Sequence, residues 1–266
     1  MTISSTNSVV FLMGPTASGK TELALEMYNQ LDASLISVDS ALIYRGMDIG
    51  TAKPSKVTLE NYPHALIDIC EPDESFSVNQ FVSLAKQHIE SALNAGKLPI
   101  LVGGTSFYFN ALEHGLSKLP ESTKDSRKYF NDRLKNQGSE KLHSQLLKID
   151  PTSATRIHPN DSQRVTRALE VFHLSGVTLS ELQGNKNENK LNHEIKKIIL
   201  MPERSELHQR IEKRFIEMIK DGFLDEVETL RKNKNLNLDL ASMRCVGYRQ
   251  AWNYFEGIYN KKEMIE

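Results

Sequence analysis

The residues best suited to do chemistry form a glycine-rich stretch near the start of the chain. Residues 14–21 fit the G-x-x-x-x-G-K-[ST] phosphate-binding pattern. Glycines let the backbone curl so that successive N–H groups point at phosphate oxygens, and a helix N-terminus adds partial positive charge. Lys20 supplies a full charge and Thr21 a hydroxyl ligand for Mg²⁺. The pattern predicts that a diphosphate or triphosphate is bound by Gly14, Pro15, Thr16, Ala17, Ser18, Gly19, Lys20 and Thr21.

Two polar residues, Asp39 and Thr105, are expected to face the same crevice. Each follows a short apolar run, and the carboxyl ends of parallel strands form the ligand crevice of an open sheet. Asp39 could hold Mg²⁺, act as a base or only cap the next segment. Thr105 could hydrogen-bond a ligand or only be the N-cap of a helix that begins near Ser106. Position alone leaves these alternatives open.

The elements that position these residues are predicted to be strands alternating with helices. Short apolar runs indicate strands at residues 9–13, 35–38, 65–69, 98–102 and 195–201. Helical spacing of apolar residues indicates helices at 21–31, from 77 to about 96, from 106, at 161–175 and at 206–219. The alternation predicts an α/β fold with a parallel sheet covered on both faces.

The middle of the chain follows a different pattern. Residues 118–197 show no strand signal and are polar and helical, with a loop predicted at 184–192. We therefore predict an α/β core formed by residues 1–117 and 198–266 and interrupted by a helical insertion at 118–197. The insertion has 15 basic and 10 acidic residues, a net charge of +5. Because the whole chain has a net charge of -1, the core carries -6, and the near-neutral total hides a basic segment.

Composition excludes several classes of protein. The 266 residues are 39% hydrophobic and 25% charged, which is typical of a folded globular chain and not of a disordered one. The apolar run at 9–13 is far shorter than the roughly 20 residues of a spanning helix, and no basic segment precedes it as in a secretory signal. Cys70 and Cys245 are too few for a disulfide scaffold. We therefore expect a cytoplasmic protein without a membrane partner.

Six stretches, in this order along the chain, resemble one family. They are Gly14–Thr21, Ser37–Tyr44, Met47–Pro54, Leu101–Thr105, Ile157–Glu170 and Arg244–Arg249. Together they resemble the bacterial tRNA dimethylallyltransferases, also called isopentenyl-tRNA transferases, over nearly the whole chain. The resemblance implies a P-loop nucleotide-kinase-like core with a helical insertion. It also implies transfer of a dimethylallyl group from dimethylallyl diphosphate to N6 of adenosine 37 in tRNA, which gives N6-isopentenyladenosine and diphosphate.

The resemblance assigns chemical roles to the crevice. Diphosphate is the leaving group, so the loop, Lys20 and a Mg²⁺ ion held through Thr21 would stabilise the negative charge that develops on it. The acceptor is a weakly nucleophilic exocyclic amine that becomes acidic on attack. Asp39 would orient this amine and take its proton, with Thr105 hydrogen-bonding nearby.

Other side chains are expected to serve the same reaction. Family analogy adds Arg127 to the catalytic residues and Arg214 to the diphosphate site. The polar run around Arg127 is also what a solvated surface arginine would show, and without the family that interpretation is the better one. The reacting adenine must leave the anticodon-loop stack to reach the crevice. Tyr44, Tyr108 and Phe109 are candidate stacking partners, with core packing the alternative for Phe109.

The resemblance places contacts with the tRNA anticodon stem-loop at the crevice, in the insertion and near the C-terminus. The residues are Asp39, Ser40, Ala41, Leu42, Thr105, Arg127, Gln163, Arg164, Val165, Thr166, Arg167, Arg244, Cys245, Val246, Gly247, Tyr248 and Arg249. Arg164 and Arg167 lie three residues apart, away from the apolar stripe that begins at Val165, so both are expected to point outward. An i,i+3 ion pair between Arg167 and Glu170 is the alternative.

Two other functions are compatible with the same pattern. A small-molecule or nucleotide kinase would use the loop for ATP and the insertion as a lid. An idle RNA-binding module would keep the loop as a remnant, but the intact Gly19-Lys20-Thr21 and the presence of Asp39 argue against it. Members of the family continue beyond the equivalent of residues 254–264 with a further basic helix, so we expect a shortened chain here. A monomer is the default expectation.

Overall fold

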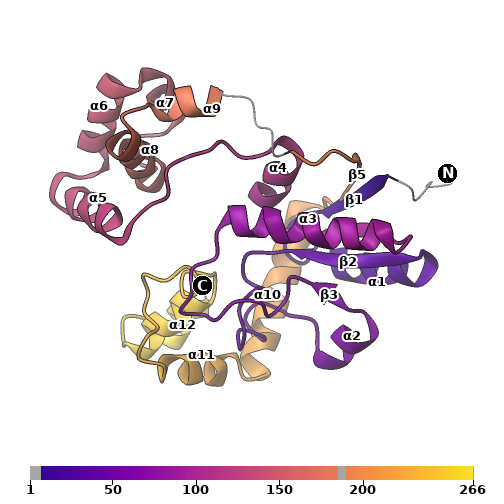
Figure 1. The fold of residues 1–266 in the computed structure, drawn as a ribbon. Coiled ribbons are helices and arrows are strands. Elements are labelled where there is room, and N and C mark those ends of the chain that lie inside the picture. Colours follow the sequence, from indigo (N-terminus) through magenta and orange to yellow (C-terminus); the bar gives the residue numbers. More distant parts are fainter. Residues whose placement is uncertain (1–6, 185–189, 266) are drawn as a thin grey trace. The chain divides into compact units, whose positions relative to one another are not determined.

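The computed structural model describes residues 7–184 and 190–265, which form two compact units (Figure 1). The first unit takes its described residues from 1–113 and 191–266, and the second takes them from 114–190. The loop predicted at 184–192 includes 185–189, which lie outside the described residues. Each unit has a hydrophobic core of its own. None of the described helices has both the length and the apolar character needed to cross a membrane.

Within the described residues, the first unit is built on a parallel five-stranded sheet in the order β3-β2-β4-β1-β5. The inner strands β1, β2 and β4 are apolar and almost fully buried, as expected for a parallel sheet covered on both faces. The edge strand β5 is exposed or half-buried along its length. The strands are β1 (Ser8–Met13), β2 (Ala33–Val38), β3 (His64–Ala65), β4 (Leu98–Gly103) and β5 (Glu194–Ile199).

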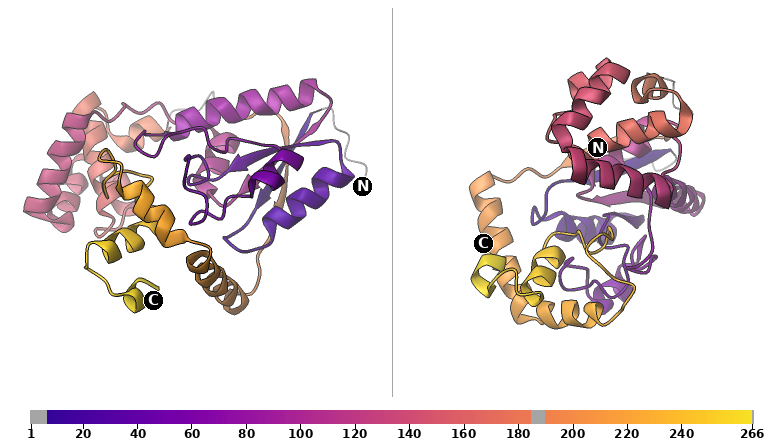
Figure 2. Two further views of the ribbon diagram at one scale, coloured as in Figure 1. Left: turned by 90° about the horizontal axis from the view of Figure 1, so that it is seen from below. Right: turned by 90° about the vertical axis from the view of Figure 1, so that its left-hand side faces the viewer.

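Helices cover both faces of this sheet (Figure 2). Helix α1 packs on the face that carries Val10 and Ile100. On the other face, the ring of Phe109 in α4 lies 5.0 Å from the ring of Phe11 in β1, and α3 packs beside α4. The helices of this unit are α1 (Lys20–Gln30), α2 (Lys56–Asn61), α3 (Val78–Asn94), α4 (Ser106–His114), α10 (Arg204–Lys220), α11 (Phe223–Arg231), α12 (Tyr248–Phe255) and α13 (Lys261–Ile265).

One predicted strand and one predicted boundary need correction. The strand expected at residues 65–69 is wrong beyond its first residue, because β3 ends at Ala65. Leu66 and Asp68 have positive φ angles of 67° and 54°, which a strand does not allow. This run is apolar because it packs against the core and not because it pairs in the sheet. The strand expected at residues 195–201 is present as β5, which begins at Glu194, ends at Ile199 and pairs with β1 along its whole length. The stretch without strands therefore ends before Glu194 and not at residue 197.

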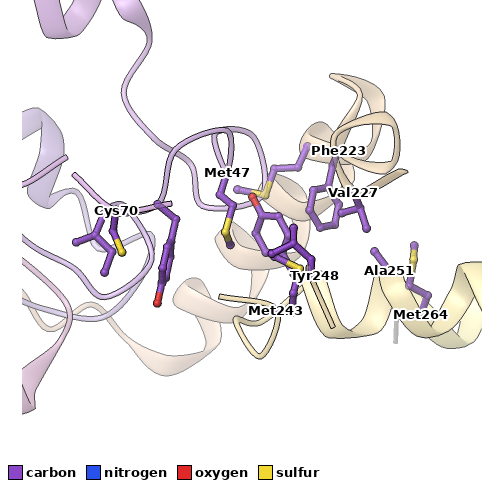
Figure 3. Packing of buried hydrophobic residues seen from close by; sticks show 12 residues of the cluster. Met47, Cys70, Phe223, Val227, Met243, Tyr248, Ala251 and Met264 are labelled. Carbon is purple, nitrogen blue, oxygen red and sulfur yellow. The ribbon is translucent and has the colours of Figure 1, made fainter. Parts of the chain in front are cut away.

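The C-terminal helices of the first unit share a second core with the loop that follows β2. Tyr44 and Met47 of that loop pack with Phe223 of α11 and Tyr248 of α12 (Figure 3). The rings of Phe223 and Tyr248 meet edge to face, with centroids 5.2 Å apart, an arrangement that aromatic pairs favour. The helices near the C-terminus therefore hold a loop that lies far earlier in the sequence.

The second unit is a bundle of short helices. Its core contains Phe130, Leu142, Val165 and Leu169 among others, so the apolar stripe predicted in the 161–175 helix faces inward. The side chain of Asp161 caps this helix by accepting a hydrogen bond from the backbone N–H of Arg164. The helices are α5 (Lys124–Gln137), α6 (Ser139–Ile149), α7 (Pro151–Arg156), α8 (Ser162–Ser175) and α9 (Leu179–Gly184).

Candidate active site

The glycine-rich loop joins the end of β1 to the start of α1, where the phosphate-binding pattern requires it. Gly19 has a φ of 89°, in the left-handed region that favours glycine. A Cβ atom at Gly14 would lie 2.6 Å from the carbonyl oxygen of Leu200, too close for any side chain. The Nζ of Lys20 donates to the carbonyl oxygen of Pro15 at 2.6 Å, so the ammonium group lies across the loop.

A cavity of about 440 Å³ opens beside this loop, a volume in the range of small-molecule sites. Its wall is formed by the loop, the carboxyl ends of β2 and β4, the segment 51–54 and helix α10. Lys20, Asp39 and Arg214 reach the cavity from three different elements. The structure thus brings together the predicted loop, the predicted carboxylate and the predicted diphosphate-binding arginine. Further residues of the wall are Glu22, Thr51, Ala52, Pro54, His64 and Arg210.

The charges that face this cavity are unbalanced. Burial lowers the pKa of Lys20 below its ordinary value; Asp39 opposes this shift and Arg214 adds to it. Burial also lowers the pKa of Arg214, with Asp39 and Glu22 opposing. These shifts mean that two partly desolvated cations lie close to each other. A bound anion such as diphosphate would relieve their repulsion, so the electrostatics favour the ligand that the loop predicts.

Asp39 is held by the turn that follows β2. Its Oδ1 accepts hydrogen bonds from the backbone N–H groups of Ala41 at 2.8 Å and Leu42 at 3.3 Å. Within the described residues its Oδ2 has no hydrogen-bond partner. The hydroxyl of Thr105 accepts a hydrogen bond from the backbone N–H of Ser40 at 3.1 Å. Asp39 therefore does cap its turn, but with one oxygen only, and Thr105 fixes that turn to the start of α4.

The aromatic residues proposed for stacking are buried. Tyr44, Tyr108 and Phe109 are 2%, 6% and 2% exposed, so each packs in the core, as the alternative for Phe109 anticipated. Burial raises the pKa of Tyr108 to about 12 and that of Cys245 to about 11, and in both cases the nearby charge of Asp39 adds to the shift. Tyr108 and Cys245 thus belong to the surroundings of Asp39 in the first unit.

The stretch Arg244–Arg249 turns some side chains outward and others inward. Arg244 and Arg249 are exposed, and Val246 is 88% exposed. Tyr248 is fully buried, and its hydroxyl donates to the Oε1 of Glu226 at 2.5 Å. Of the residues predicted here to bind tRNA, the two arginines are open to a ligand, whereas the side chain of Tyr248 is part of the core.

The remaining predicted residues lie in the second unit. Arg127 is exposed on α5, and Gln163 and Arg164 are exposed at the start of α8. The expectation that Arg167 points outward with Arg164 is wrong, because its guanidinium donates to Glu170 at 2.6 Å and to Ser122 at 2.7 Å. The alternative i,i+3 ion pair is therefore present, since Glu170 is buried and attracts the charge. Val165 and Thr166 complete this segment, with Val165 in the core.

Comparison with known proteins identifies the family. A model described as IPP transferase matches residues 42–266. A tRNA dimethylallyltransferase of Ruthia magnifica subsp. Calyptogena magnifica is 62% identical over 266 residues, which cover all of this chain and 87% of that relative. The chain belongs to the tRNA dimethylallyltransferase family. The match favours the prenyltransferase over the kinase alternative.

Solved structures of this family agree with the fold. A full-length tRNA isopentenylpyrophosphate transferase from Bacillus halodurans is 36% identical, with a TM-score of 0.68, over 97% of this chain and 80% of that chain. A eukaryotic dimethylallyltransferase described as acting on tRNA is 25% identical, with a TM-score of 0.76, over 97% of this chain and 65% of that one. The predicted family, α/β P-loop fold class and enzyme class are thus confirmed.

Sequence reasoning missed several residues of the cavity in this family member. Arg210 lies one turn before Arg214 on α10, and both line the cavity. Their i,i+4 spacing is a signal that could have suggested a cationic face. Thr51 and Pro54 belong to the stretch Met47–Pro54, which resembles the family but to which the sequence assigns no role. His64 could not be found, because the position of β3 depends on pairing between distant segments.

The network around Glu170 makes a prediction about the second unit. Burial alone would raise the pKa of Glu170, but hydrogen bonds from Ser122, Ser126 and Arg167 outweigh it and hold the pKa below its ordinary value of 4.5. A carboxyl group whose pKa is lower in the folded than in the unfolded state stabilises the fold. This stabilisation is complete above the pKa of the unfolded state and is lost as the pH falls through the pKa of the folded state. Glu170→Gln should therefore lower the melting temperature at pH 7 and lower it less at pH 3, which is below the ordinary value of 4.5.

Thermal unfolding at the two pH values measures this difference. Glu140→Gln, an exposed glutamate of the same unit, is the matched control and should shift the melting temperature little at either pH. An equal loss of stability at both pH values in Glu170→Gln would show that the ionised network is not the source of the effect.

Proposed function

We propose that this chain transfers a dimethylallyl group from dimethylallyl diphosphate to N6 of adenosine 37 in tRNA and releases diphosphate. The observation that carries the proposal is the cavity in which Lys20 and Arg214 lie close to Asp39 beside a phosphate-binding loop. Cations beside the loop suit the leaving group, and a carboxylate suits the acceptor amine. Both kinds of group are needed for the same transfer.

The donor half of the reaction is electrostatic. Breaking the allylic C–O bond leaves negative charge on diphosphate and positive charge on the allyl fragment. Preorganised donors and cations that face the developing negative charge lower the barrier without rearranging. The N-terminus of α1, Lys20 and Arg214 are the groups of this chain that supply that charge.

Mg²⁺ is the cofactor that the donor implies. Within the described residues, no group of three His, Cys, Asp or Glu side chains is placed to hold a metal ion. That finding fits Mg²⁺ bound with its substrate, since this ion keeps several waters and takes few protein ligands besides phosphate oxygens. Thr21, which lines the cavity, would hold it. The ion would neutralise part of the diphosphate charge.

The acceptor half rests on Asp39. The adenine amine is a weak nucleophile, and its attack on the allyl carbon forms the N–C bond and leaves an acidic N–H. The carboxylate of Asp39 takes that proton, and its Oδ2 is available because only Oδ1 is used by the turn. Arg244 and Arg249, exposed in the same unit, are proposed to bind the RNA backbone near the extruded base.

The experiment that tests the proposal is transfer of radiolabel from dimethylallyl diphosphate to unmodified tRNA in the presence of Mg²⁺. Label should enter tRNA with adenosine at position 37, and tRNA with guanosine there should stay unlabelled. Absence of label in the adenosine substrate would refute the activity. The proposal includes a cytoplasmic monomer whose partners are tRNA and the diphosphate donor. Gel filtration with light scattering measures the oligomeric state.

The second unit is proposed to add to tRNA affinity through its exposed arginines. Arg164 pairs with Asp161 on the surface, and its side chain is 75% exposed. Arg164→Ala should weaken tRNA binding by roughly threefold to tenfold and reduce the slope of log K against log salt by about one, as expected for one lost phosphate contact. Fluorescence titration at several salt concentrations measures both, with Lys148→Ala, an exposed lysine of the same unit, as control. An unchanged slope would place the phosphate contacts elsewhere.

A further inference from the structure

The carboxylate of Glu226 on α11 binds three successive backbone N–H groups of a distant loop. Its Oε2 accepts from Asp48 at 2.8 Å and from Ile49 at 2.7 Å, and its Oε1 accepts from Gly50 at 3.2 Å. The hydroxyl of Tyr248 donates to the same Oε1 at 2.5 Å. Both carboxylate oxygens are thus occupied, and the four donors come from two segments far apart in the sequence.

The loop held in this way leads directly into the wall of the cavity. Thr51, Ala52 and Pro54, which line the cavity, follow the three bonded N–H groups. Lys53 anchors the far side of the same loop, because its buried ammonium binds Asp68 at 2.5 Å and the Tyr44 carbonyl at 2.8 Å. Because Glu226 holds one side of the loop and Lys53 the other, the position of the cavity wall depends on these two residues.

Packing at Gly50 shows how closely the loop approaches the C-terminal helices. A Cβ atom at Gly50 would lie 2.3 Å from the ring of Phe223 and 2.7 Å from the ring of Tyr248. Figure 3 shows Met47 of this loop beside Tyr248 and Phe223. The backbone of the loop therefore contacts these rings, and Glu226 adds hydrogen bonds to this apolar packing.

We propose that Glu226 is a positioning residue for the transfer reaction, since it fixes the Asp48–Gly50 backbone and through it the wall formed by Thr51–Pro54. The inference rests on the proposed function, because it assigns the cavity to the allylic diphosphate. Glu226 is not among the described residues that line the cavity. It acts by holding the loop in the conformation that binds the donor, as supporting groups do for catalytic sites.

The test is Glu226→Gln, with donor binding measured by calorimetry using dimethylallyl diphosphate without tRNA. Glutamine has the same shape, but its amide nitrogen cannot accept a hydrogen bond. The donors that bind one of the two carboxylate oxygens in the wild type therefore lose their acceptor. We expect the dissociation constant to rise about tenfold and KM for the donor to rise in parallel, with kcat within about threefold of wild type. Glu228→Gln, an exposed glutamate two residues along α11, should bind like wild type.

A purely structural role would give a different result. Loss of stability lowers the fraction of folded protein, so the number of binding sites and the apparent kcat would fall while the dissociation constant and KM stay unchanged. That outcome would overturn the inference. Failure of the proposed function is separate, since it would appear as absent tRNA labelling by the wild-type chain.

A second variant keeps the inference testable if Glu226→Gln does not fold. Tyr248→Phe keeps the ring packed against Phe223 and Gly50 but removes one of the four donors to Glu226. The donor dissociation constant should rise about twofold to threefold in this variant. Binding identical to wild type in Tyr248→Phe, together with no folded Glu226→Gln, would count against the positioning role.

Discussion

Replacing Asp39 by asparagine should reduce turnover at least about a hundredfold, because the variant cannot take the proton of the attacking amine. Asparagine is the sharper substitution than alanine, since its side-chain oxygen can still accept from Ala41 and Leu42 and preserve the turn. Asp39→Ala should lose at least as much. Single-turnover labelling of tRNA measures the chemical step apart from product release.

Donor binding should behave differently from turnover in the same variant. Asp39, together with Glu22, opposes the lowering of the pKa of Lys20 and Arg214, so removing its charge makes the cavity more positive. Dimethylallyl diphosphate should therefore bind with unchanged or higher affinity. Asp32→Asn, an exposed aspartate that precedes β2, serves as control for the loss of one charge. Near-normal turnover in Asp39→Asn would assign proton removal to another group or to water.

The sequence predicts those parts of the site whose positions depend on residues close together in the chain. A strand, a glycine-rich loop and a helix follow one another within residues 8–30, so the phosphate site could be placed from spacing alone. Asp39 and Thr105 could be placed because parallel strands end at the same edge of a sheet. The strands β2 and β4 do pair directly, and their ends bring these two residues to one turn.

The parts that could not be predicted depend on contacts between distant segments. Glu226 carries no local signal, because a glutamate on a helix is usually solvated and only the folded loop supplies three N–H donors. Arg167 shows the converse, since helical spacing placed it on the outer face while a buried Glu170 draws it inward. The strand predicted at residues 65–69 ends early for a similar reason. Leu66 and Asp68 have positive φ angles, and Asp68 binds Lys53, which lies 15 residues away.

Replacing Lys20 by methionine should weaken binding of dimethylallyl diphosphate by about tenfold to a hundredfold. Methionine keeps much of the aliphatic stem but removes the ammonium group, and a hydrogen bond to a charged group contributes about 1.5–3 kcal/mol. The stem must be kept because Lys20 is partly buried at the start of α1. Calorimetry at fixed Mg²⁺ measures the change, and kcat should fall as well, since the same charge stabilises the departing diphosphate.

The comparison with Arg214→Met decides whether the two cations act on one ligand. Lys20 and Arg214 line one cavity, and Asp39 opposes the lowering of the pKa that burial causes in both. If both bind the diphosphate, each single variant should lose affinity, and the double variant should depart from additivity, as neighbouring groups with a shared partner do. Lys234→Ala, an exposed lysine of the same unit, should have no effect. Unchanged donor affinity in Lys20→Met would mean that the diphosphate lies away from the glycine-rich loop, and the cavity would then have to be assigned to the acceptor.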